Sequence, residues 1–287
     1  MTKTATQYKA YNGRNVDQMP LMLAQGVVPL PTAEFMRNRE AIVGQLGDIY
    51  ADASDFVAYG GKRASDEIRM IMTVDNQGRI TEAGRKALEL ISPVQERSSG
   101  AIVLNDELYD GFNGANVVAL SRKDLKKYGV DKNLTEAQVL NHPGWRVLLR
   151  HPDAVPAEFA YDKGFMQEVV GRTFAEMNKQ HGYTEGMGFY PDGSEKHAKL
   201  RAWYVLRLGN GSDARGGSDL GSDRGRFVGI APEAPNTPIE VPSAEPSQTV
   251  KPYTPADLHA FDEAMRGLEA VVRSDVLKPF ANLRKKL

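Results

Sequence analysis

Residues 199–231 read KLRAWYVLRLGNGSDARGGSDLGSDRGRFVGIA, and this stretch is the most informative about the fold. Apolar side chains recur along 199–208 in a pattern typical of a β-strand, and a second apolar run follows at 225–231. Because one long loop joins the two runs, we expect 225–231 to be the hairpin partner of 199–208. The loop itself, 209–226, is rich in glycine, serine and aspartate, which favour turns.

The loop 209–226 repeats the triplet Gly-Ser-Asp three times and interleaves it with arginines. Carboxylates and hydroxyls on a glycine-rich backbone can converge on a hard cation such as Ca²⁺ or Mg²⁺. Alternatively, backbone amides and arginines can cradle a phosphate, or the loop can simply form turns with Asp–Arg pairs. The metal-ligand candidates are Asp213, Asp219 and Asp223, and the ligand-binding candidates in the loop are Arg215, Arg224 and Arg226.

The expected strand 199–208 also carries basic and aromatic residues on one face. Arg201, Trp203 and Arg207 share this face, opposite Arg226 on the expected partner strand. Such a face can stack on the bases of a single-stranded nucleic acid and bind its backbone. If Trp203 is instead buried beneath a helix, no such face remains.

The composition limits the classes of partner and chemistry. The 287 residues include 36 Lys and Arg against 37 Asp and Glu, and 41% are hydrophobic, as in an ordinary globular protein. This balance argues against nucleic acid as the main partner, although a local basic patch stays possible. The absence of cysteine excludes disulfides, thiolate zinc sites, iron–sulfur clusters and cysteine nucleophiles.

The hydropathy pattern predicts neither a signal peptide nor a membrane span. Residues 1–15 are polar, and no apolar stretch approaches the length of about 18 residues that a spanning helix needs. We therefore expect a soluble cytoplasmic protein that does not contact a membrane.

Residues 20–231 are expected to form one α+β domain of mixed helices and a small, mostly antiparallel sheet. Alternating or short apolar runs predict the strands, and capping residues with helical spacing predict the helices. Besides 199–208 and 225–231, the expected strands are 68–74, 101–104, 116–120 and 186–190, and the expected helices include 32–46, 49–59 and 156–182.

Three further segments are expected outside this domain. Residues 1–19 are predicted to be a mobile arm, and 232–254 a proline-rich linker or strap. Residues 255–287 are predicted to be an amphipathic helix with a basic tail, which can dock on its own chain, bind a protein partner or pair with a second copy. The apolar seam of this helix comprises Leu258, Phe261, Met265, Leu268 and Val272.

Two His-Pro dipeptides are the remaining candidates for a site. His142 and His151 have the chemistry of a divalent-metal ligand or a general base. The alternative is that both mark helix ends, where the following proline stops the helix and the histidine caps backbone carbonyls.

No standard catalytic motif survives inspection, since Walker A, dinucleotide-binding, H-E-x-x-H and nucleophile-elbow patterns are all missing. The preferred hypothesis is therefore a binding or interaction protein. The first alternative is a metal-dependent phosphoester hydrolase that uses the Gly-Ser-Asp loop with His142 or His151 as base. The second is a structural subunit that assembles through 255–287. Whether the protein is an enzyme is left open.

Overall fold

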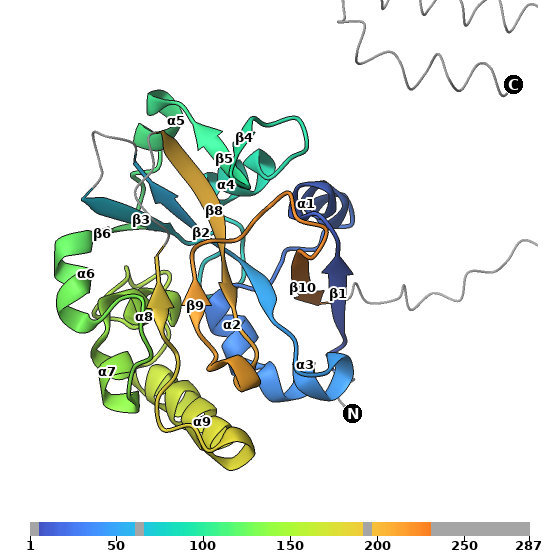
Figure 1. Ribbon diagram of the computed structural model, residues 1–287. Helices are drawn as coiled ribbons and strands as arrows, with labels where there is room; N and C mark the ends of the chain where they lie inside the picture. Colours follow the sequence, from blue (N-terminus) through green and yellow to red (C-terminus); the bar gives the residue numbers. More distant parts are fainter. Residues whose placement is uncertain (1–5, 61–65, 192–196, 231–287) are drawn as a thin grey trace, which may run out of the picture. The chain divides into compact units, whose positions relative to one another are not determined.

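The computed structural model describes residues 6–60, 66–191 and 197–230 (Figure 1). Its strands are β1 (Tyr8–Asn12), β2 (Ala51–Tyr59), β3 (Glu67–Ile71), β4 (Arg97–Ser98), β5 (Ala101–Leu104), β6 (Val117–Ser121), β7 (Phe189–Tyr190), β8 (Ala198–Val205), β9 (Ala214–Arg215) and β10 (Arg226–Ile230). Its helices are α1 (Asn15–Ala24), α2 (Thr32–Arg37), α3 (Arg39–Leu46), α4 (Glu82–Leu90), α5 (Asp106–Asp110), α6 (Arg122–Tyr128), α7 (Glu136–Asn141), α8 (Pro143–Leu148) and α9 (Lys163–His181), with a 3-10 turn at Leu208–Asn210.

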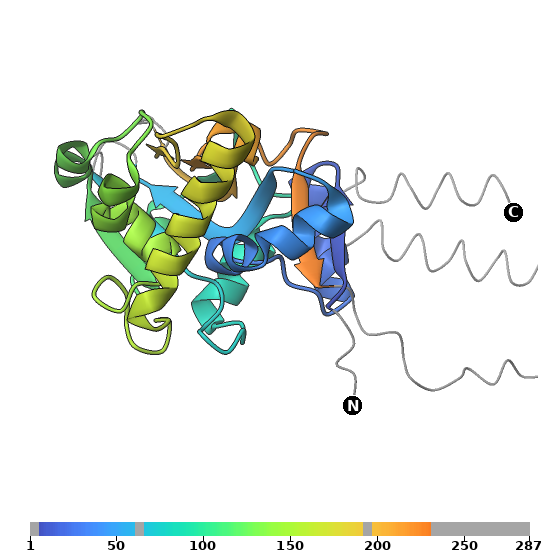
Figure 2. The same ribbon diagram turned by 90° about the horizontal axis from the view of Figure 1, so that it is seen from below.

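All these strands belong to one sheet, whose main path runs β1-β10-β2-β8-β5-β4. β3 and β6 extend the sheet from β2, and β9 and β7 extend it from β8. Most neighbours are antiparallel, but β10 is parallel to β2 and β7 is parallel to β9. β1 and β10 lie side by side in Figures 1 and 2, and Tyr8 pairs with Ile230 across them.

The prediction of a small, mostly antiparallel sheet is wrong, because the sheet is large and mixed. Two strands come from segments that the sequence pattern assigned otherwise: 51–59 was expected to be a helix and 8–12 part of a mobile arm. Residues 51–59 are buried without a break, and the buried residues include the polar Asp52, Ser54 and Asp55, whose burial the local sequence does not indicate. Residues 8–12 form a strand because β10 offers its edge, which local sequence does not reveal.

The middle of the sheet is buried on both faces. Along β2, Val57 and Tyr59 belong to one apolar core, whereas Phe56 and Ala58 belong to another. The first core includes residues of α2, α3 and α6 to α9, and the second includes residues of α1, α4 and α5. In Figure 1, α7, α8 and α9 gather at the lower left, away from α4 and α5 at the top.

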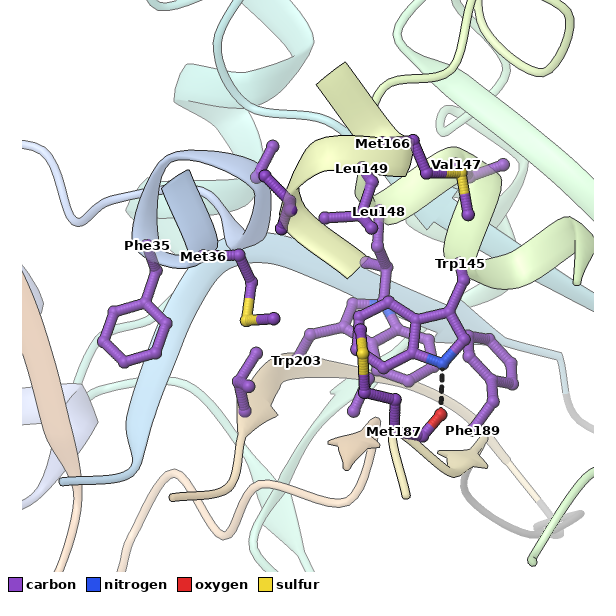
Figure 3. Close-up of a cluster of buried hydrophobic side chains, with 14 of the residues drawn as sticks. Phe35, Met36, Trp145, Val147, Leu148, Leu149, Met166, Met187, Phe189 and Trp203 are labelled. Carbon is purple, nitrogen blue, oxygen red and sulfur yellow. Dashed lines mark hydrogen bonds between the residues drawn. The ribbon is translucent and has the colours of Figure 1, made fainter. Parts of the chain in front are cut away.

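Large aromatic side chains dominate the first core (Figure 3). Trp145 and Trp203 are both fully buried, and the Trp145 indole N–H donates a 2.6 Å hydrogen bond to the Met187 carbonyl. The ring of Phe189 lies 4.8 Å from that of Trp203. This packing fixes β7 and β8 against the helical layer, and with them the loop that follows β8.

The predicted hairpin between 199–208 and 225–231 is also wrong. β10 pairs with β1 and β2, and β2 separates it from β8. A long connection does not determine which strands pair, because its geometry imposes no register. The expected strands at 68–74, 101–104 and 116–120 are confirmed as β3, β5 and β6, within a few residues.

Two predicted helices have different limits. The long helix begins at Lys163 rather than at Pro156, because Asp162 caps it by accepting hydrogen bonds from the Gly164 and Phe165 N–H groups. The helix expected over 32–46 is divided at Asn38 into α2 and α3.

The predicted linker 232–254 and C-terminal helix 255–287 lie outside the described residues, and so does the seam of that helix. The expected arm 1–19 does not extend to residues 8–19, which form β1 and part of α1. No helix in the described part of the chain combines the length and hydrophobicity that crossing a membrane requires.

Candidate functional site

Arg39 holds the beginning of the loop that carries the Gly-Ser-Asp triplets. The Arg39 guanidinium donates hydrogen bonds of 2.5 Å to the Ser212 hydroxyl and to the Leu206 carbonyl. Arg39 is only 2% exposed, and burial lowers its pKa to about 10. This arginine on α3 therefore fixes the point where the chain leaves β8.

Asp52 in β2 anchors the far end of the same loop. Its carboxylate accepts hydrogen bonds from the Ser218 hydroxyl at 2.7 Å and from the Arg226 backbone N–H at 2.8 Å. Asn15 in α1 donates to the same hydroxyl at 3.4 Å. Burial raises the pKa of Asp52 above the ordinary carboxyl value.

Arg201, a predicted ligand-binding residue, is instead part of this anchoring. It is 5% exposed and donates hydrogen bonds to the Tyr59 hydroxyl at 2.7 Å and to the Ser218 and Ser99 carbonyls at 2.8 and 2.5 Å. Trp203 is fully buried as well, so the predicted basic and aromatic face of Arg201, Trp203 and Arg207 does not exist.

Arg207 alone of that predicted face is exposed. Its Nε donates a 2.5 Å hydrogen bond to the Asn210 side chain. Both faces of β8 are covered over most of its length, so alternation along this strand separates two cores rather than a core from solvent.

The three loop aspartates do not converge. Asp213 is buried, accepts from the Gly188 N–H at 2.9 Å and pairs with Arg215 at 3.2 Å. Asp219 closes a turn by accepting from the Gly221 N–H at 3.0 Å, and Asp223 is exposed. Among the residues that the structure describes, no three His, Asp or Glu side chains are placed to bind a metal, so these aspartates do not form the predicted Ca²⁺ or Mg²⁺ site.

Both candidate histidines cap backbone N–H groups. Nδ1 of His142 accepts from the Gly144 and Trp145 N–H groups at 3.1 and 3.4 Å, at the first turn of α8. Burial lowers the pKa of His142 to about 4, which leaves the ring neutral and able to accept. Nδ1 of His151 accepts from the Asp153 N–H at 3.2 Å. The expectation that they cap carbonyls is wrong, because in both rings Nδ1 is the nitrogen without a proton and accepts from backbone N–H groups.

Three side chains from different strands meet across β7, β9 and β8. The strand register pairs Tyr190 with Arg215, and Arg215 with Tyr204. Paired residues of neighbouring strands project their side chains to the same side. The Arg215 guanidinium lies 4.4 Å from the centre of the Tyr190 ring.

This series continues beyond β8. The ring of Tyr50, just before β2, meets that of Tyr204 edge-on at 6.5 Å, and the Arg226 guanidinium lies 5.2 Å from the Tyr50 ring. All the members are partly exposed. We call them the tyrosine–arginine row, which consists of Tyr190, Arg215, Tyr204, Tyr50 and Arg226.

The row offers ring surfaces and guanidinium N–H groups in a fixed arrangement. Arg215 is oriented by Asp213, and Arg226 donates from Nε to Asn12 at 2.7 Å. Arginines stacked on tyrosine rings keep further N–H donors for carboxylate or phosphate groups. Sequence reasoning selected both arginines but missed the tyrosines, because only strand pairing brings the tyrosines next to them.

Comparisons with known proteins show that the fold of this chain is similar to that of a solved structure. No protein-family model and no curated protein matches the chain. A solved structure that does match is described as the accommodation of massive sequence variation in Nanoarchaeota by the C-type lectin fold. The match has a TM-score of 0.50 at 14% sequence identity and covers 80% of this chain and 99% of the other.

The chain is similar in fold to a C-type lectin-fold protein. At this identity the likeness concerns the fold alone. Within this C-type lectin-like fold, the tyrosine–arginine row lies on β7, β9, β8 and β10 and on the residue before β2.

Proposed function

We propose that this chain is a binding protein that contacts a protein partner through the tyrosine–arginine row. The observation that carries the proposal is the row itself, in which three tyrosines and two arginines lie next to one another on partly exposed positions. Tyrosine and arginine are enriched at protein interfaces, where each contributes a large contact area and hydrogen bonds.

The surroundings of the row favour binding without rearrangement. The loop between β8 and β10 is tied down by Arg39, Asp52 and Arg201, all of which are buried. A contact surface that is ordered before binding loses little conformational entropy on association. Rigid aromatic anchors of this kind are typical of antibody contact loops, which also present tyrosine at low entropic cost.

The chemistry of the row favours a partner that carries carboxylates. Arg215 and Arg226 have guanidinium groups at the surface, and Arg224 next to them is exposed. Guanidinium groups bind carboxylates with two parallel hydrogen bonds. We therefore expect the partner surface to combine acidic side chains with apolar ones that pack on the tyrosine rings.

The chain is similar to a structure described as accommodating massive sequence variation by the C-type lectin fold. This likeness supports separate roles for the buried residues that maintain the fold and the exposed residues that contact a partner. Under the proposal, buried anchors such as Asp52 determine the backbone of the loop. Exposed positions such as Asp219, Asp223 and Arg224 adapt the surface to a partner without altering the fold.

Selection from a random peptide library against the full chain tests the proposal. We expect the selected peptides to be rich in aspartate and glutamate and to bind the Tyr204→Ser/Arg215→Ser variant at least tenfold more weakly. The matched control is Tyr128→Ser/Arg85→Ser, which removes the same residue types from exposed positions on other elements. This control is expected to bind as the wild type does.

Two results would contradict the proposal. One is equal binding of the selected peptides to the row variant and to the control. The other is the failure to select any peptide while a single-stranded oligothymidylate binds the wild type and not the row variant, since this would assign the row to nucleic acid.

A further inference from the structure

A groove of about 620 Å³ lies between residues 26–31 and the turn 74–78, and it shares no lining residue with the tyrosine–arginine row. Glu34, Tyr161 and Ile230 complete its lining. Its volume falls within the range of roughly 300–1,000 Å³ that is typical of small-molecule sites. Neither composition nor any local motif points to this groove, because it is assembled from four separate parts of the chain.

The groove has apolar walls. Val27 and Val28 line one wall and Val74 lines the other, while Ile230, at the end of β10, is 52% exposed. Leu30 also belongs to the lining. Val27, Leu30 and Val74 are already buried, so the apolar surface that a ligand can cover comes mainly from Val28 and Ile230.

The charged side chains of the lining, all of whose residues the structure describes, are both acidic: Glu34 and Asp75. The Glu34 carboxylate accepts a 2.6 Å hydrogen bond from the Tyr161 hydroxyl. Burial, together with Glu34, raises the pKa of Tyr161, so this hydroxyl stays protonated and donates. The groove therefore presents carboxylate oxygens, which attract a cation.

Each acid has an exposed arginine partner as well as other donors. The Asn38 amide also donates to Glu34 at 3.2 Å, and the Gln77 and Arg79 backbone N–H groups donate to Asp75 at 2.9 Å. Arg37 contacts Glu34 at 2.6 Å with its side chain 41% exposed, and Arg79 contacts Asp75 at 2.7 Å with its side chain 72% exposed. Exposed ion pairs of this kind contribute only about 0–1 kcal/mol. A ligand cation can therefore displace Arg37 from Glu34 at little cost. Asp75, whose side chain is 11% exposed and accepts three hydrogen bonds, contributes negative charge rather than an open acceptor.

Hydrogen bonds fix both walls of the groove. Asn76 donates from its side chain to the Ala157 and Ala160 carbonyls at 3.3 and 3.2 Å, and from its backbone to Glu158 at 2.9 Å. On the other wall, the Leu30 N–H donates to the β10 carbonyl of Val228 at 2.8 Å. The groove is therefore formed before a ligand arrives.

We propose that this groove binds a cationic amphiphile, a small molecule with an apolar body and a primary ammonium group. The ammonium donates hydrogen bonds to the Glu34 carboxylate, and Asp75 adds a second negative charge in the same groove. The apolar body packs against Val28 and Ile230.

Calorimetric titration of the full chain with three probes of similar shape tests this site. Tryptamine carries the ammonium, tryptophol replaces it with a neutral hydroxyl, and indole-3-propionate replaces it with a carboxylate. We expect tryptamine to bind at least tenfold more tightly than tryptophol, because its ammonium group gains a charged hydrogen bond to Glu34. Indole-3-propionate, whose carboxylate cannot donate to Glu34, should bind at least tenfold more weakly than tryptamine. Equal binding of the three probes, or no binding of tryptamine, would overturn the proposal.

Substitutions assign the binding to the groove. Glu34→Gln keeps an oxygen that can accept from Tyr161, and it should weaken tryptamine binding at least tenfold without changing tryptophol binding. Asp75→Asn is the second variant and should also weaken tryptamine binding. Glu40→Gln, which removes an exposed carboxylate from α3, is the control and should bind as the wild type does. Unchanged tryptamine binding by both Glu34→Gln and Asp75→Asn would also overturn the proposal.

Discussion

Two buried tryptophans of the first core differ in one hydrogen bond. The indole N–H of Trp145 donates to the Met187 carbonyl (Figure 3), whereas that of Trp203 has no hydrogen-bond partner among the described residues. Trp145→Phe leaves a buried carbonyl unpaired, which costs about 1–3 kcal/mol in addition to the lost packing. Trp203→Phe loses packing only and is expected to lower the free energy of unfolding by less.

Urea unfolding of both variants measures this difference, with Val94→Ala as the control. Val94 is 85% exposed, so its substitution should change the free energy of unfolding by less than about 0.5 kcal/mol. An equal loss in Trp145→Phe and Trp203→Phe would show that the hydrogen bond to Met187 adds nothing.

At the scale of the element, the first turn of α8 depends on a neutral histidine. His142 has a folded pKa of about 4, lowered by burial from its ordinary value of 6.5. A lowered pKa means that its contribution to stability is present above pH 6.5 and is lost as the pH falls toward 4. A shift of this size corresponds to about 3 kcal/mol.

The prediction is a pH-dependent difference between the wild type and His142→Asn. Asparagine also caps helix N-termini but does not titrate, so this variant should lose less stability between pH 6.5 and pH 4 than the wild type. His142→Ala, which has no cap, should be the less stable of the two variants at pH 7. Parallel stability curves for the wild type and His142→Asn over this range would contradict the assignment.

Two helical glycines provide a matched test of how elements pack. A Cβ on Gly84 in α4 would collide with the Thr73 carbonyl oxygen, whereas a Cβ on Gly44 in α3 meets nothing within 4 Å. Gly84→Ala should therefore cost about 1–3 kcal/mol through overpacking. Gly44→Ala should stabilise by about 0.5–1 kcal/mol, because alanine loses less backbone entropy in a helix. Thermal unfolding measures whether each variant is less or more stable than the wild type. A stabilised Gly84→Ala would contradict the close approach of α4 to Thr73.

At the scale of the whole molecule, a buried ion pair joins the sheet to the helical layer. Asp55 in β2 accepts from the Arg150 guanidinium at 2.7 Å and from the Thr32 backbone N–H at 2.8 Å. Arg150 is the second residue after the end of α8 and is 2% exposed. The pair thus connects β2 with α2 and with the segment between α8 and α9.

Substituting one partner of this pair should lower the free energy of unfolding more than substituting both. Asp55→Asn and Arg150→Met each leave one buried charge without its partner, and each is expected to cost about 3–5 kcal/mol. The double variant buries no unpaired charge and should be more stable than either single variant. Chemical unfolding of the four proteins in a double-mutant cycle measures the coupling, and additive losses would contradict it.

Local patterns predicted much of the secondary structure but little of the candidate site. The strands β3 and β5 follow from short apolar runs, and the apolar face of α9 follows from helical spacing. The tyrosine–arginine row did not follow, because Tyr50 and Tyr190 are 140 positions apart and neither belongs to a motif. The sequence pattern selected Trp203 as a ligand-binding residue because it shares a strand face with two arginines. In the structure Trp203 is buried, whereas Tyr204 is partly exposed.

The sequence by itself determined the chemistry that is possible here and most of the local elements. The absence of cysteine excludes thiol and thiolate groups from any site, and apolar periodicity is a local property that neighbouring residues reveal. Only the tertiary structure decided that β10 joins β1, that 51–59 is a strand, and that a row and a groove form. The physical reason is that strand pairing and burial on both faces depend on contacts between distant segments, whose register no local pattern encodes.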